Sequence, residues 1–330
     1  NIRFPQVGRY PRQHEEHQWP AERYPFAYSA IPDPFNDNLD SVLKRPESDP
    51  LVMHTHTNTE YWQRYASLGH TDPRTGGDLE LPSNVRMYVI ASAQHGGSHT
   101  PSEGNFSQQL PNQMSTGPTL RAVLALMDKW ATDGTLPPAS RIPLRTDNTL
   151  DWSDSILSRF PRIPGFNLPA SPSRLFKYNY GPKFDSGQIT EHPPSMVPNQ
   201  EYRLQVPEVD SDGNDIAGIR TPEIQVPIGT HTGWSLRKAG VAEGDLFSLT
   251  GSFVPFARTE KERMLNNDPR LSIEERYASH EVYVNAIANA AHKLVAQGML
   301  LREDAERYIK AAQERNPLDS NVPLRPLILM

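Results

Sequence analysis

The run NVRMYVIAS, residues 84–92, constrains the fold more than any other stretch of this sequence. Its centre is apolar at successive positions, a pattern typical of a strand that is covered on both of its faces. Fully covered strands belong to parallel sheets, because the helices that connect parallel strands lie on both sides of the sheet. The run therefore predicts a central parallel strand and, with it, an α/β fold.

The flanking elements fit the same architecture. PLVMHTHT, residues 50–57, predicts an earlier strand, and NTEYWQRYASL directly after it has its aromatic and apolar residues at helical spacing. Residues 118–134 predict a second helix, since Pro118 suits a first turn and Gly134 suits a helix end. Strand, helix, strand and helix in this order predict part of a sheet with right-handed crossovers.

The chain divides into three parts by the character of its sequence. Residues 1–135 carry the predicted strands and helices of the α/β core. Residues 136–200 are rich in proline and have no period, which predicts an ordered extended connection or a linker. Residues 201–330 combine a small β element with helices that we expect to pack on the core.

The last part carries recognisable start and stop signals. The Asp-Gly dipeptide at 212–213 favours a tight hairpin exposed to solvent. Ser272 and Glu275 have the spacing of a capping box and predict the start of a helix that ends at Gly298. A further helix is predicted over residues 302–315.

Composition narrows the classes of partner and of chemistry. The formal charge is −6, from 33 basic and 39 acidic residues that are well mixed, so we expect no nucleic-acid partner. No stretch approaches about 18 uninterrupted apolar residues, so we expect a soluble chain without a membrane span. The chain has no cysteine, which excludes disulfides, thiolate metal sites and cysteine nucleophiles. The compartment stays open, with an extracytoplasmic location favoured over a cytoplasmic one.

Polar residues follow both early strands and suggest two members of a catalytic triad. Glu60 comes just after the first strand, and His95 follows the second in the sequence QHGG. The carboxyl ends of neighbouring parallel strands meet at one edge of a sheet. In a triad the acid orients the imidazole and stabilises its charged form. The alternatives are a loop histidine without a chemical role and a first-turn carboxylate favoured by the helix dipole.

The nucleophile of such a triad is missing from the chain. An α/β-hydrolase presents its serine in the pattern G-x-S-x-G, at a sharp turn between a strand and a helix. Ser98 in GGSHT and Ser235 in GWSLR keep only the first of the two glycines. The triad therefore cannot be completed within this sequence.

A metal site is the alternative use of the histidines. His54 and His56 lie two residues apart on a strand and so point to one face. The acidic turn DSDGND, residues 210–215, has some of the spacing of a calcium loop but lacks its closing glutamate, so an exposed hairpin turn is favoured. Candidates to complete a histidine site are His70, Asp72, His95 and His99.

Several blocks of the sequence are similar to one family. They are NTEYWQRYASLGHTD, NVRMYVIASAQHG, PPASRIPL, VDSDGNDIAGIRTPEIQVPIGTHTGW and LTGSFVPFARTEKERMLNNDPRLSIEERY. Together they resemble the C-terminal part of a large α/β-hydrolase-domain family of bacterial and fungal proteins related to serine hydrolases. The similarity runs along nearly the whole chain. It implies that residues 1–135 form the C-terminal half of the hydrolase core, with the nucleophile-bearing N-terminal part missing from a processed or partial chain.

The resemblance also implies roles for individual residues. Glu60 matches the acid and His95 the base, in the order serine, acid, histidine of α/β-hydrolases, and Asp72 is the reserve acid. It implies a serine esterase that acts on a small ester without a cofactor. Its serine would lie on an upstream segment or a separate subunit. The alternative is a non-catalytic relative, or a metal-binding one that uses His54 and His56.

Overall fold

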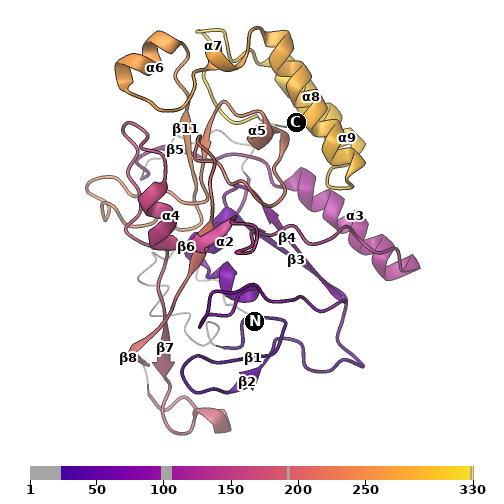
Figure 1. Ribbon diagram of the computed structural model, residues 1–330, viewed down its shortest axis with the longest axis vertical. Coiled ribbons are helices and arrows are strands. Elements are labelled where there is room, and N and C mark those ends of the chain that lie inside the picture. The colour runs from indigo at the N-terminus through magenta and orange to yellow at the C-terminus, as the bar shows by residue number, and fades with distance from the viewer. Residues whose placement is uncertain (1–23, 98–105, 192–193, 328, 330) are drawn as a thin grey trace.

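The computed structural model describes residues 24–97, 106–191, 194–327 and 329 of the chain (Figure 1). Its strands are β1 (Ile31–Pro32), β2 (Leu39–Asp40), β3 (Val52–Thr57), β4 (Val85–Ile90), β5 (Leu110–Pro111), β6 (Leu150–Trp152), β7 (Leu175–Asn179), β8 (Ser195–Tyr202), β9 (Gln205–Pro207), β10 (Gly229–His231) and β11 (Ser252–Pro255). Its α-helices are α2 (Asn58–Gln63), α3 (Gly117–Asp133), α4 (Ser153–Arg159), α5 (Pro222–Gln225), α6 (Glu260–Asn266), α7 (Ile273–Arg276), α8 (His280–Ala296) and α9 (Arg302–Glu314). Short 3-10 helices span Ala66–Gly69 and Phe184–Ser186. Within the described residues, no helix combines the length and the apolar character needed to cross a lipid bilayer.

A parallel pair of strands lies at the centre of the molecule. β3 and β4 pair in parallel along all 6 residues of each strand. β4 is buried at every position except Arg86. Its second edge carries short parallel bridges from Tyr88 to Arg141 and from Ile90 to Ile219, so β4 lies inside the sheet and not at its edge. The predicted central parallel strand and the predicted α/β fold are confirmed.

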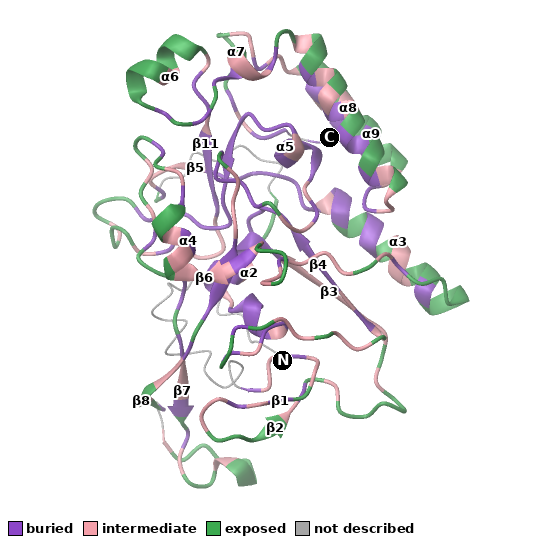
Figure 2. Cartoon of the chain, in the orientation of Figure 1, coloured by how far each residue is buried: buried purple, intermediate pink, exposed green. Residues whose placement is uncertain are grey.

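The two faces of β4 pack into two separate hydrophobic cores, because side chains alternate between the faces of a strand. Tyr88 packs in the core that contains Tyr283 of α8, and Val89 packs in the core that contains Trp62 and Trp234. Figure 2 shows buried residues filling this centre, while the outer faces of α8 and α9 are exposed. Burial of large aromatic side chains contributes strongly to core stability. The cores on both faces therefore fix where the carboxyl end of β4 lies.

Antiparallel pairs surround the parallel centre. β10, β11 and β5 form a three-stranded sheet, while β6–β9, β7–β8 and β1–β2 form two-stranded pairs. The β7–β8 ribbon extends away from the centre at the lower left of Figure 1. Residues 136–200 include β6, α4, β7 and the start of β8, so the proline-rich segment contains regular structure. The division of the chain at residues 135 and 200 stays a prediction.

The helix predicted from Ser272 to Gly298 is in fact two helices. The capping box of Ser272 and Glu275 opens only α7, which is 4 residues long. Ser279 then caps α8, because its side-chain oxygen accepts a hydrogen bond from the backbone N–H of Val282. The prediction of one helix was wrong because this second N-cap serine offers the backbone a new helix start.

The other helix predictions have mixed outcomes. α3 and α9 confirm the helices predicted over residues 118–134 and 302–315. The helical pattern that follows β3 is broken, since α2 ends at Gln63 and a 3-10 helix begins at Ala66. Between them Tyr65 has a φ of 61°, which lies in the left-handed region and interrupts an α-helix.

The Asp-Gly turn at 212–213 is a turn as predicted, but it is buried and not exposed. Gly213 has a φ of 80°, and Val209 and Asp215 form an antiparallel bridge across the turn. Asn214 is fully buried and Asp215 is 3% exposed. The turn is buried because the side chain of Asp215 reaches between the ends of β3 and β4, where it is hydrogen-bonded to both connections.

Candidate active site

The start of α2 orients the carboxylate of Glu60. Thr57 is the last residue of β3 and the N-cap of α2, and Glu60 occupies the third helical position, which completes a capping box. Glu60 Oε2 accepts hydrogen bonds from the backbone N–H and from the hydroxyl of Thr57, each at 2.6 Å. Oε1 of Glu60 is left to point toward the loop that follows β4.

His95 lies in that loop and meets Glu60. Its Nδ1 donates a hydrogen bond to Glu60 Oε1 at 2.5 Å. The His95 side chain is 55% exposed, whereas that of Glu60 is 13% exposed. Among the residues that the structure describes, no side chain is hydrogen-bonded to His95 Nε2. Because Nδ1 holds the proton shared with the carboxylate, Nε2 of the neutral ring is a hydrogen-bond acceptor.

The pair favours an ionised carboxylate beside an imidazole of increased basicity. Burial alone would raise the pKa of Glu60, but hydrogen bonds from His95 and Thr57, together with the charge of His56, lower it to about 2. The hydrogen bond to Glu60 raises the pKa of His95 above its ordinary value, although partial burial opposes the rise. A carboxylate that stabilises an imidazolium in this way suits the acid and the base of a triad.

The pair opens into a pocket of about 610 Å³. The pocket is lined by Glu60 and His95, by apolar side chains, and by Thr55 and Thr116. Apolar and aromatic members of the wall are Phe26, Tyr65, Ala66, Ile90, Leu120 and Leu249. Residues 136–234 contribute nothing to the described wall of this pocket.

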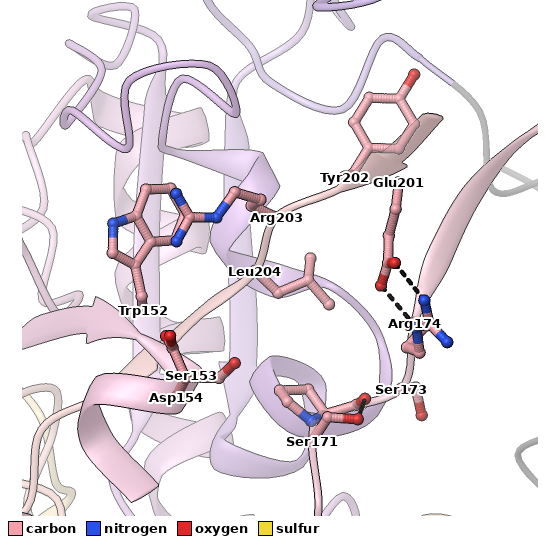
Figure 3. Close-up of a pocket in the computed structure, with 11 residues that line it drawn as sticks. Trp152, Ser153, Asp154, Ser171, Ser173, Arg174, Glu201, Tyr202, Arg203 and Leu204 are labelled. Atoms are coloured by element: carbon pink, nitrogen blue, oxygen red, sulfur yellow. Dashed lines mark hydrogen bonds and ion pairs between the residues drawn. The ribbon is translucent and has the colours of Figure 1, made fainter. Parts of the chain in front are cut away.

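A second pocket, of about 280 Å³, lies beside β6 and β8 and is a different environment. Figure 3 shows the guanidinium of Arg203 over the indole of Trp152, 4.0 Å from the ring centroid, and Arg174 paired with Glu201. No histidine stands among the described residues that line it. General base chemistry is therefore better placed in the larger pocket.

His54 and His56 form part of the wall of the larger pocket. Their ring centroids are 4.0 Å apart, and the hydroxyl of Tyr28 is hydrogen-bonded to His54 Nδ1 at 3.0 Å. In the described part of the chain, no group of three or more His, Cys, Asp or Glu side chains is placed to hold a metal ion. His70 is buried and bonded to a tyrosine hydroxyl, and burial lowers its pKa to about 4. His99 lies outside the described residues.

Two of the three carboxylates of the acidic turn pair with arginines of the chain itself. Asp210 pairs with Arg220 at 2.9 Å, and Asp212 pairs with Arg276. Asp210 also accepts backbone hydrogen bonds from within the turn. The carboxylate oxygens that would be ligands of a calcium ion already have partners within the chain, which opposes the calcium alternative.

The remaining candidates lie away from His95. The reserve acid Asp72 accepts hydrogen bonds from the side chain and the backbone of Arg74, and it does not contact His95. The structure thus brings Glu60 to the histidine instead of Asp72. Ser235 is fully buried and does not line the larger pocket, and Ser98 lies outside the described residues.

The sequence did not predict the contacts of three buried polar residues close to the segments that carry Glu60 and His95. Asn58, Ser92 and Asp215 are each at most 3% exposed, and both Asn58 and Ser92 are hydrogen-bonded to Asp215. No local pattern signals them, because 123 residues separate Asp215 from Ser92 and 157 separate it from Asn58. The Asp-Gly turn was the nearest signal, and it indicated an exposed hairpin.

Comparison with known proteins gave one match. A family model described as an alpha/beta hydrolase domain matches residues 7–310. No curated protein and no solved structure matches the chain. The family match agrees with the resemblance seen in the sequence blocks, but it gives no support to the expectation that an N-terminal part of the domain is missing.

Proposed function

The chain belongs to the alpha/beta hydrolase domain family, and from this premise we propose that it is a serine esterase in which Glu60 is the acid and His95 the base. The observation that carries the proposal is the 2.5 Å hydrogen bond between these side chains. They follow neighbouring parallel strands in the order acid, then histidine. That is the order and the place in which α/β-hydrolases hold these two groups.

The chemistry would use the free nitrogen of His95. Nε2 takes the proton of a serine hydroxyl while the serine oxygen attacks the ester carbonyl. The charged imidazole, stabilised by Glu60, then gives this proton to the departing alcohol, which leaves an acyl-enzyme. Nε2 next takes a proton from water as the water attacks the acyl group, and returning that proton to the serine releases the acid.

The larger pocket supports a small ester as the substrate. Leu120 and Leu249 supply apolar wall near the pair, and such a wall suits an acyl chain or an alkyl alcohol. The volume of about 610 Å³ is within the usual range of small-molecule sites, about 300–1,000 Å³.

The serine is proposed to come from polypeptide outside these 330 residues, as an upstream segment or a separate subunit. In support, the sequence has no G-x-S-x-G pattern. No serine is among the described residues that line the larger pocket. Nε2 of His95, which has no hydrogen-bonded partner among the described residues, is where such a serine would bind.

The test uses the protein expressed from its full-length gene and a fluorophosphonate probe that labels activated serines. We expect His95→Ala to lower kcat/KM for short-chain esters by about 10⁴-fold or more. Glu60→Gln should lower it by about 10²–10⁴-fold. The matched control is Asp72→Asn, which removes a carboxylate that does not contact His95 and should leave the rate unchanged.

Two results would overturn the proposal. Ester cleavage by His95→Ala within tenfold of the parent would remove His95 from the chemistry. Peptide mapping of the labelled serine checks the source of the nucleophile. A label on a serine inside residues 1–330 would show that the nucleophile is not supplied from outside them.

A further inference from the structure

One buried carboxylate joins the two connections that carry Glu60 and His95. Asp215 accepts hydrogen bonds from the side-chain amide of Asn58, at 2.9 Å to Oδ1 and 2.8 Å to Oδ2. Asp215 Oδ2 also accepts from the backbone N–H of Ser92 at 2.6 Å. Asn58 is two residues before Glu60, and Ser92 is three residues before His95. A single side chain is thus bound to both connections.

The contact with Ser92 is reciprocal and fixes a turn. The backbone N–H of Asp215 donates to Ser92 Oγ at 2.7 Å, while Ser92 N–H donates to the Asp215 carboxylate. Ser92 has a φ of 57°, a left-handed conformation that is unfavourable for a residue other than glycine. The paired hydrogen bonds hold this residue where the chain leaves β4 and turns toward His95.

The contact with Asn58 uses both ends of its amide. Its nitrogen donates to Asp215, and its oxygen accepts from the backbone N–H of Gly233 at 2.8 Å. The hydroxyl of Thr59 donates to the carbonyl of Gly233 at 2.6 Å. These bonds hold the first turn of α2, which contains Glu60, against the interior of the protein.

The direct backbone link between the two connections is weak by comparison. It is one hydrogen bond from Thr59 N–H to the carbonyl of Ala93, at 3.4 Å. The Glu60–His95 bond itself includes a side chain that is 55% exposed. Asp215 is 3% exposed, and a hydrogen bond in a buried environment is electrostatically stronger than one in water.

We propose that Asp215 is the positioning residue of the Glu60–His95 pair, because it sets the separation of the two connections at which Nδ1 of His95 meets Oε1 of Glu60. Any effect of Asp215 on catalysis rests on the proposed function, whereas its effect on the geometry of the Glu60–His95 pair does not. Both oxygens of Asp215 act only as acceptors. In Asp215→Asn, an amide NH₂ group replaces one of these oxygens. It then faces a hydrogen-bond donor of Asn58 or Ser92, so that hydrogen bond is lost.

The test measures the pKa of His95 by NMR in the full-length protein with isotope-labelled histidine, and His95→Ala identifies its signal. Glu60→Gln gives the pKa of His95 with the pair broken. We expect Asp215→Asn to lower the pKa of His95 by more than half of the decrease seen in Glu60→Gln. The matched control is Asp212→Asn in the same turn, which removes an ion pair with Arg276 and should leave the pKa of His95 unchanged.

A swapped pair of residues separates positioning from general damage to the fold. In the double variant Asn58→Asp with Asp215→Asn, the donor and the acceptor exchange places, and position 58 still accepts from Gly233. We expect the double variant to restore the pKa of His95 toward that of the parent. It also serves as the test if Asp215→Asn alone does not fold.

The outcomes keep the two proposals apart. If Glu60→Gln lowers the pKa of His95 and Asp215→Asn, folded by its amide spectrum, does not, the positioning role is wrong and the pair stands. If the double variant folds but the pKa of His95 stays at the Glu60→Gln value, the positioning role is also wrong. If the pKa values behave as expected but the parent cleaves no ester, the proposed function fails and the positioning role stands.

Discussion

Replacing Glu60 with glutamine is expected to destabilise the protein at neutral pH and to have no effect near pH 2. The pKa of Glu60 is about 2 in the folded protein against an ordinary value of 4.5. That difference, at about 1.36 kcal/mol per pH unit, corresponds to about 3 kcal/mol of stability. The His95 side of the pair is 55% exposed, so water and salt screen part of this energy. We therefore expect a loss of about 1–3 kcal/mol in the free energy of unfolding at pH 7.

The sign of the pH dependence follows from the direction of the shift. A carboxyl whose pKa is lower in the folded state contributes its full stability above its unfolded pKa, near 4.5, and loses it as the pH falls toward 2. The parent and Glu60→Gln should therefore differ most at pH 5 to 7 and converge below pH 3.

Urea unfolding of the two proteins at pH 7, 5, 4 and 3 measures this difference. Glu47→Gln is the control, since Glu47 is exposed and surface substitutions usually change stability by less than about 0.5 kcal/mol. A loss at pH 3 as large as that at pH 7 would show that Glu60→Gln acts through packing and not through charge. A loss below about 0.5 kcal/mol at pH 7 would show that the pair contributes little.

Further predictions concern the supports of the pair and one other buried acid. Thr57→Val removes the N-cap hydroxyl bonded to Glu60 and should lower the free energy of unfolding by about 1 kcal/mol in urea titrations. Gly233→Ala would place a Cβ 2.3 Å from the backbone nitrogen of Thr59, so we expect a lower melting temperature and a lower pKa of His95 by NMR. Burial raises the pKa of Glu223 to about 8, so the protein should lose stability as the pH rises from about 4.5 to 8. Glu223→Gln mimics the protonated acid, and its unfolding free energy should therefore exceed that of the parent above pH 8 but not at pH 5.

The central strand and the candidate pair were predictable because their signals are local. The apolar residues from Met87 to Ile90 in β4 are consecutive, and this local pattern indicates burial on both faces of the strand. Glu60 is oriented by Thr57, only three residues away, so its direction is set by a capping box that the sequence shows directly. The order of Glu60 and His95 along the chain then follows the order of their strands.

The buried support was not predictable, because its partners are distant in sequence. Nothing near Asp215 indicates that it will contact Asn58 and Ser92, which are 157 and 123 residues away. The start of α8 was missed for a different reason. Ser272 and Ser279 both offer helix caps, and only the three-dimensional packing decides that α7 stops between them.

The two ring nitrogens of His95 therefore differ in how far their surroundings could be predicted from the sequence. Nδ1 is hydrogen-bonded to Glu60, whose carboxylate is oriented by a residue three positions earlier in the chain. We attribute the distance between the two side chains to the contacts of Asp215, which join residues far apart in sequence. Nε2 has no hydrogen-bonded partner within the described residues. Because Glu60 is hydrogen-bonded to Nδ1, the serine of the proposed triad would have to contact the imidazole at Nε2. Under the proposed function, the position of the pair thus restricts where the serine of the triad can lie.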